Sequence, residues 1–263
     1  MNQTPPLSVN LTQEELSIVL AQLGTRELAG LENHWQKDLN STNLTMALDI
    51  GMRSLIARGL CQPTLEQNQV RLKPSVIALV GVCAKPEVSI HLRRKDGQNP
   101  MEQYYFHFAQ KLFVAHTVPF TGIHAFVAFQ SQPEFLQAFT AAVNLPSNMG
   151  REQPAVEIKT ADYEAACQSA ENGDVQPISA SLTAAGMPSE QAGDLADALL
   201  SPDFMLSLDH YLIAPNASAS LNLLGKEKQL WMVRQEAGQE TAQVQIVSSE
   251  TAMSKLQELV AVA

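Results

Sequence analysis

One arrangement occurs twice in the chain: an apolar helical stretch, four short segments in which apolar and polar residues alternate, and an amphipathic helix. The first copy covers Pro74–Val143 and the second covers Pro188–Val262. Successive strand residues point to opposite faces of a sheet, so this alternation predicts half-buried strands. Turn-forming segments such as DGQNP and PFTG separate the strands of the first copy. Each copy therefore predicts a helix, a four-stranded antiparallel meander and a second helix.

The repeated order predicts an α+β fold with antiparallel sheets, flanking helical bundles and a quasi-two-fold helix–four strands–helix duplication. The two copies share this order but little residue identity. With 263 residues and 45% apolar content, the chain is long enough to form a large core. Joining the two meanders, or packing them around a pseudo-two-fold axis, would bury both faces. We therefore expect one composite domain over 1–263, with halves 1–150 and 151–263 that meet in the polar stretch Asn144–Pro154.

Three helices are expected before the first meander. Thr12 and Glu15 form a capping-box pattern in LTQEELSIVLAQLG, which ends at the helix-stopping Gly24. A second helix over Leu44–Leu60 ends in the basic and glycine pair Arg58–Gly59. The third segment, LKPSVIALVGVCAKPE, has a proline at a first-turn position and an apolar body. A buried helix is the preferred interpretation of this segment, and a buried strand is the alternative.

The charge balance argues against nucleic-acid and membrane binding. The chain has 17 basic and 27 acidic residues and a formal charge of −10, whereas binding to phosphate backbones or anionic lipids relies on basic patches. Met1–Asn10 lacks the charged and apolar regions of a secretory signal. The longest apolar run, Val76–Ala84, is too short to cross a bilayer. We expect a cytoplasmic protein with no nucleic-acid or membrane partner.

The sequence contains none of the familiar catalytic signatures for phosphate binding, dinucleotide binding, serine hydrolysis or zinc proteolysis. The three cysteines are far apart and predict free thiols, with Cys83 buried in an apolar helix. In FMLSLDHYLIA, Asp209 and His210 are adjacent strand residues that point to opposite faces, so they are poorly placed to act as a dyad. The sequence therefore predicts no enzyme and no cofactor.

Two other functions remain as alternatives. His107, His116 and His124 lie on consecutive predicted strands and could converge as metal ligands or as a base cluster, although their spacing is also that of ordinary hairpins. The N-terminal helices followed by a β segment resemble a winged helix, in which Leu44–Leu60 would read DNA. That helix carries only Arg53 and Arg58 as cations, which disfavours the DNA-binding alternative.

The chain opens with LTQEELSIVLAQLG, a helix ending in ARGL, a helix ending in CAKPE and a strand SIHLRR. In this order the motifs resemble the opening of the EspG family of type VII secretion chaperones. Those proteins have an N-terminal T-x-x-E-L-type helix, a helix ending in an RGL-like step, and a helix ending at a P-[DE] pair before a β-hairpin. The duplicated layout and the strand QLWMVRQE before a capped helix are similar too, so the resemblance covers most of the chain. Thr25–Asn40 does not follow the family pattern. The matching residues are Leu11, Thr12, Glu15 and Leu16, then Arg58, Gly59 and Leu60, then Lys85, Pro86 and Glu87.

The resemblance implies a non-enzymatic cytosolic chaperone or adaptor that binds a helical secretion substrate of the PE–PPE type. In the EspG family, the hairpin after the P-[DE] step and the C-terminal helical region meet the substrate. The first carries over to RRKDGQNPM, which also contains a compact basic cluster suited to an acidic partner or to a solvated hairpin tip. The partner-binding residues that the resemblance implies are Arg93, Arg94, Lys95, Asp96, Gln98, Asn99 and Met101 in the hairpin, and Gln191, Asp194 and Leu195 in the helical region.

Overall fold

The computed structural model describes residues 7–31, 39–64, 70–147, 149–173, 175–212, 218–236 and 238–261. The middle of the unassigned stretch Thr25–Asn40 and the last residue of the second repeated segment, Val262, lie outside these ranges. The chain forms two compact units. Unit 1 comprises Met1–Ser89 and Tyr104–Phe135, and unit 2 comprises Ile90–Gln103 and Leu136–Ala263.

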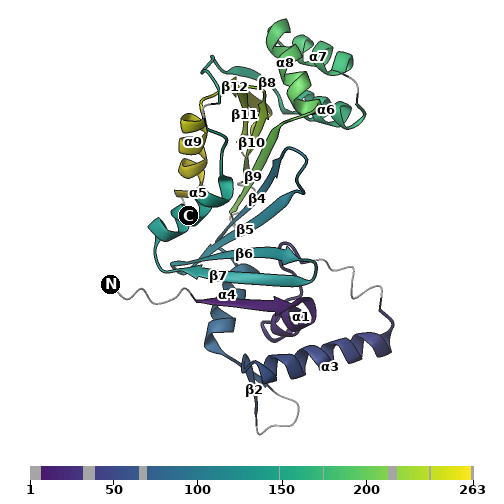
Figure 1. The fold of residues 1–263 in the computed structure, drawn as a ribbon, viewed down its shortest axis with the longest axis vertical. Coiled ribbons are helices and arrows are strands. Elements are labelled where there is room, and N and C mark those ends of the chain that lie inside the picture. The colour runs from purple at the N-terminus through teal and green to yellow at the C-terminus, as the bar shows by residue number, and fades with distance from the viewer. Residues whose placement is uncertain are drawn as a thin grey trace. The chain divides into compact units, whose positions relative to one another are not determined.

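Unit 1 combines helices with an antiparallel sheet whose strand order is β1-β7-β6-β5. Strands β2 and β3 form a separate small hairpin. Its elements are β1 (Ser8–Thr12), α1 (Gln13–Gln22), α3 (Ser41–Ala57), β2 (Cys61–Pro63), β3 (Val70–Leu72), α4 (Pro74–Ala84), most of β5 (Glu102–Ala109), β6 (Leu112–Phe120) and β7 (Ile123–Phe129) (Figure 1).

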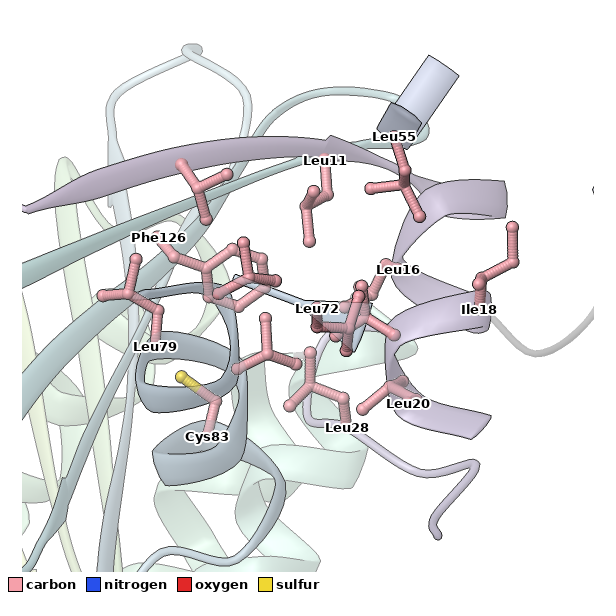
Figure 2. Packing of buried hydrophobic residues seen from close by; sticks show 14 of the residues in the cluster. Leu11, Leu16, Ile18, Leu20, Leu28, Leu55, Leu72, Leu79, Cys83 and Phe126 are labelled. Atoms are coloured by element: carbon pink, nitrogen blue, oxygen red, sulfur yellow. The ribbon is translucent and has the colours of Figure 1, made fainter. Parts of the chain in front are cut away.

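The core of unit 1 lies between helices α1, α3 and α4 and one face of the sheet. Figure 2 shows Leu16 of α1, Leu55 of α3 and Leu79 of α4 around Leu11 of β1 and Phe126 of β7, and all five are fully or almost fully buried. Burying a leucine or phenylalanine side chain of this kind contributes about 1.5–3 kcal/mol. The apolar side chains of the three helices therefore hold them against this face of the sheet.

Unit 2 contains a second antiparallel sheet segment with the strand order β4-β9-β10-β11-β12-β8. The helices α6, α7 and α8 pack together next to it (Figure 1). Its elements are most of β4 (Val88–Asp96), most of α5 (Gln132–Val143), β8 (Val156–Lys159), α6 (Thr160–Glu171), α7 (Val175–Ala184), α8 (Ser189–Leu200), β9 (Phe204–Leu212), β10 (Ser218–Lys226), β11 (Gln229–Gln235), β12 (Thr241–Ile246) and α9 (Ser249–Ala261).

The core of unit 2 joins these three helices to the sheet. Tyr163 of α6 and Leu195 of α8 are buried in one cluster with Trp231 of β11 and Val244 of β12. Alternate residues of each strand thus face the helices, as the period of two requires. At the other end of the same sheet face, side chains such as Asp209 are partly exposed.

The expected α+β fold with antiparallel strands is confirmed. Both repeated segments have the expected element order, α4 to α5 through four strands and α8 to α9 through four strands. The third segment is a helix, Pro74–Ala84, as preferred over a strand. The order extends beyond the expected repeats, because β1 and β8 each pair antiparallel with the last strand of a meander and each leads directly into a helix. That the repeat reflects a duplication stays a prediction.

Candidate protein-binding surface

The candidate surface begins at the hairpin tip, which we define as residues 95–101, the end of β4 and the turn that leads into β5. Asp96, Gln98, Asn99 and Met101 are exposed, and Lys95 is half-buried. The N–H of Asn99 donates to the carbonyl of Asp96 at 3.0 Å. The intervening Gly97 has a φ of +55°, a conformation that glycine adopts without the steric cost of a side chain. The hairpin tip therefore presents polar groups and one methionine on a closed turn.

The two arginines that precede the tip are both paired with carboxylates within the chain. Arg93 donates to the Asp209 carboxylate at 2.9 Å and to the Ser207 hydroxyl at 3.0 Å, both on β9. Arg94 donates to Glu102 at 2.9 Å and to Asp96 at 3.0 Å, and its guanidinium carbon lies 6.0 Å from the centre of the Phe204 ring. These contacts attach β4 to β9 and close the base of the hairpin. The two arginines thus hold the base of the hairpin in place.

Asp203 lies in the loop between α8 and β9 and forms hydrogen bonds with the hairpin tip and with the β10–β11 turn. Its carbonyl accepts from the Gly97 N–H at 2.7 Å, and its own N–H donates to the Gly225 carbonyl at 2.8 Å. Its carboxylate accepts from the Glu227 N–H at 2.8 Å. The Lys226 ammonium donates to the carbonyl of Ser201, just after α8, at 2.7 Å. The hairpin tip, the end of α8 and the β10–β11 turn therefore form one continuous edge of unit 2.

The residues suggested on α8 have three different environments. Gln191 donates to the side chain of Gln153 at 2.7 Å, and Asp194 accepts from the side chain of Gln229 at 3.0 Å. Leu195 is fully buried in the core of unit 2, so its side chain supports the helix and is not part of the surface. The structure thus brings the hairpin and α8 to the same edge through Asp203, while the side chains of Gln191 and Asp194 are held by neighbouring glutamines.

Sequence reasoning did not include Asp203, Glu227 or the β10–β11 turn among the candidate surface residues. A signal was present, because Pro202–Asp203 follows α8 as Pro86–Glu87 follows α4. The hydrogen bonds of Asp203 to positions 22 and 24 residues later cannot be inferred from that pair. Their discovery needs the register of β9 against β10.

The three histidines lie in a buried row across β5, β6 and β7. His116 Nε2 and His124 Nδ1 are 3.0 Å apart, and His107 Nδ1 is 3.0 Å from the Ser89 hydroxyl. The His116 ring stacks on Phe126 with centres 4.6 Å apart. Burial lowers the pKa values of His107 and His124 to about 4. Burial, with the neighbouring His124 and His107, lowers the pKa of His116 to about 2, so all three rings are neutral at pH 7.

The histidine row shows the features of packed core residues. Among the described residues, no group of three or more His, Cys, Asp or Glu side chains is arranged to hold a metal ion. Elsewhere, His210 is buried while Asp209 binds Arg93 on the other face of β9, so the adjacent pair points apart as expected. Burial raises the pKa of the Cys83 thiol well above its usual value, which keeps it unreactive.

The cations of the proposed DNA-reading helix both bind carboxylates. Arg53 pairs with Asp49 one turn earlier on α3. Arg58 donates to Glu15 at 2.7 Å and to the backbone carbonyl of Asn10 at 2.6 Å. Because both guanidinium groups pair with carboxylates, neither arginine provides an unpaired positive charge on this helix. None of the described helices has the length and apolar content needed to cross a membrane.

The sequence model of one protein family, described as "Uncharacterised protein YfjC", matches residues 26–256. The chain belongs to the YfjC family. A search of curated proteins finds no match to this YfjC-family chain.

Among solved structures, the YfjC-family chain is similar to the type VII secretion chaperone EspG5 of Mycobacterium tuberculosis, determined in complex with the PE25–PPE41 dimer. The two are 11% identical with a TM-score of 0.61, over 94% of this chain and 92% of EspG5. The resemblance to EspG is thus confirmed at the level of the fold. The peroxisomal multifunctional enzyme type 2 of Drosophila melanogaster is 9% identical with a TM-score of only 0.17, over 91% of this chain and 48% of that enzyme.

Proposed function

We propose that this protein is a non-enzymatic chaperone or adaptor that binds a helical secretion substrate, of the PE–PPE type that EspG5 binds, in the cytosol. The observation that carries the proposal is the likeness of fold to EspG5 over nearly the whole length of both chains. A likeness at 11% identity concerns the fold, so the choice of partner rests on the surface of this chain.

The hairpin tip is the surface that we assign to the partner. Met101 is 39% exposed and is surrounded by polar side chains of the tip. An accessible apolar side chain with a polar rim is the usual arrangement of a binding hot spot. The ion pairs of Arg93 and Arg94 and the backbone bonds of Asp203 hold this tip in place before binding. Such preorganisation reduces the entropy lost on association.

Copurification from the native host, followed by mass spectrometry, tests this function. Wild-type protein is compared with Met101→Asp, which places a charge at the tip, and with Met46→Asp, which makes the same change on the exposed face of α3. We expect one helical secreted protein to be recovered with wild type and with Met46→Asp, and to be lost with Met101→Asp. Recovery of the same protein with all three would exclude the hairpin tip. Isolation of the wild type without any partner, together with turnover of a small substrate, would contradict a non-enzymatic binding role.

A further inference from the structure

Unit 2 contains a polar pocket on the same sheet as the hairpin. The pocket has a volume of about 290 Å³ and opens over β9, β10 and β11, next to the start of α6. It is lined by the side chains of Asp209, Tyr211, Ser220, Gln235, Glu236 and Thr160, among others. These residues lie on the sheet face beyond the part that α6, α7 and α8 cover.

The pocket wall offers hydrogen-bond acceptors and an aromatic ring. Asp209 binds Arg93 through one oxygen, and Glu236 binds Arg234 through one oxygen and accepts from the Gln239 side chain at 3.2 Å through the other. Each carboxylate oxygen can accept more than one hydrogen bond. The Tyr211 side chain is 49% exposed. Within the described part of the chain, the buried hydroxyl of Thr160 has no hydrogen-bond partner. A buried polar group without a partner costs free energy that a ligand can recover.

Most of the negative charge of the protein lies in the unit that contains this pocket. Unit 2 contains 18 acidic and 9 basic residues, whereas unit 1 contains 9 acidic and 8 basic residues. The stretch Thr160–Leu200, which begins at the pocket and forms α6, α7 and α8, has seven acidic residues and no Lys, Arg or His. A surface of one sign attracts ligands of the other sign and speeds their encounter.

We propose that this pocket binds an arginine or lysine side chain from a basic segment of the partner protein. The proposal rests on the partner-binding function above and names the chemistry of the partner. Carboxylates bind guanidinium and ammonium groups by charge-assisted hydrogen bonds, and the exposed Tyr211 ring can stack on the same cation. Arg93 provides an example within the chain, because its guanidinium lies between Asp209 and Ser207 on this sheet face.

Amide NMR of the isotope-labelled full-length protein, recorded with and without two short unlabelled peptides, tests the pocket. One contains two arginines among glycines and serines, and the other has glutamates in their place. We expect the arginine peptide to shift the amide signals of Asp209, Ser220 and Glu236 and the glutamate peptide to leave them unchanged. The double variant Asp209→Asn, Glu236→Gln removes two charges from the pocket, and Glu250→Gln, Glu258→Gln removes two charges from α9.

The paired variants separate a pocket from a general charge effect. We expect the pocket variant to weaken the arginine peptide at least fivefold and the α9 variant to weaken it less than twofold, with unchanged circular dichroism for both. Equal weakening by the two variants, equal binding of the two peptides, or no shift at these amides would overturn the inference. The proposed function is judged separately. If a partner is recovered that depends on Met101 but the arginine peptide does not bind, the proposed function stands and the pocket inference fails. If the arginine peptide binds but no partner is recovered, the pocket inference stands and the proposed function fails.

Discussion

Glu87 and Asp203 make the same pair of backbone contacts in the two repeated segments. The Glu87 N–H donates to the carbonyl of Phe108 on the second strand of its meander at 2.8 Å, and its carboxylate accepts from the Gln110 N–H at 3.2 Å. The two contacts of Asp203 with Gly225 and Glu227 are equivalent, each 2.8 Å long. The turn residues that these carboxylates bind, Gln110 and Glu227, have φ values of 52° and 54°. The two repeated segments therefore share individual hydrogen bonds as well as element order.

The first prediction concerns these two carboxylates. Each one binds the N–H of a non-glycine residue in the left-handed region, where that residue is strained. Asp203→Ala and Glu87→Ala should each lower the free energy of unfolding by about 1–2 kcal/mol, since a charged acceptor is lost from a strained turn. Asp197→Ala, which removes an exposed acid from α8, should change it by less than about 0.5 kcal/mol. Urea unfolding of the three variants measures the difference, and equal values for all three would contradict this role.

The second prediction concerns Arg58, which sequence reasoning regarded as part of a helix end. Its guanidinium binds the Glu15 carboxylate, whose side chain is completely buried, and the outward carbonyl of Asn10 on the edge strand β1. Arg58→Ala should cost about 2–3 kcal/mol, because it leaves a buried charge without its partner while Arg58 itself is partly exposed. Arg53→Ala breaks an exposed pair on α3 and should cost less than about 0.5 kcal/mol. Thermal melts of the two variants measure both losses of stability. Salt-dependent DNA binding that either variant weakens would instead favour the winged-helix alternative.

The third prediction is loss of stability in acid. The folded pKa values of His107, His116 and His124 are lowered to about 4, 2 and 4, whereas unfolded histidine titrates near about 6.5. Below that pH the unfolded chain binds protons that the folded chain does not. Stability is therefore fully present above about pH 6.5 and falls by about 1.4 kcal/mol per histidine for each pH unit below it.

Melting curves between pH 7 and pH 4.5 measure this slope. A double variant, His116→Phe with His124→Leu, removes two of the three buried rings and should reduce the contribution of the row to roughly a third. His91→Gln in unit 2 removes a half-buried histidine outside the row and should leave most of the slope in place. A variant without His116 and His124 that is as sensitive to acid as the wild type would refute the role of the row.

The fourth prediction compares two glycines with positive φ. Gly150 has a φ of +80°, and a Cβ there would overlap the carbonyl oxygen of Val247. Gly186 has a φ of +101°, with nothing within 4 Å of such a Cβ. Gly150→Ala should therefore cost about 3 kcal/mol or more, whereas Gly186→Ala should cost only the backbone strain of about 1 kcal/mol. Denaturant titration compares the two, and a smaller loss for Gly150→Ala would show that the close approach to Val247 is not maintained.

Local signals in the sequence predicted much of the fold. The capping box is present with both bonds, Thr12 Oγ1 accepting from the Glu15 N–H and Glu15 accepting from the Thr12 N–H. Gly24 and Gly59 follow their helices with positive φ, as expected for glycine stops. The eight meander strands were predicted because each alternates over several residues. Such features depend on neighbours within a few positions, which a sequence shows directly.

Elements that depend on distant partners were missed. β1 has only five residues and is defined by its pairing with β7, more than a hundred positions later. α7 was not predicted because its ten residues, VQPISASLTA, include a proline near the start and several serine and threonine residues, which are weak helix formers. On the candidate surface, the exposed tip could be placed by its turn residues. The burial of Leu195 and the bonds of Asp203 depend on how α8 and β10 pack, which spacing alone does not reveal.

Hydrogen–deuterium exchange of the protein with and without its copurified partner tests the central claim most directly. Binding through the hairpin tip should slow exchange in residues 95–101 and in the adjacent β10–β11 turn, because a partner shields these backbone amides from solvent. The exposed face of α3 around Met46 and Ile50 should exchange equally fast in both states. Protection of α3 together with unchanged exchange at residues 95–101 would contradict the account.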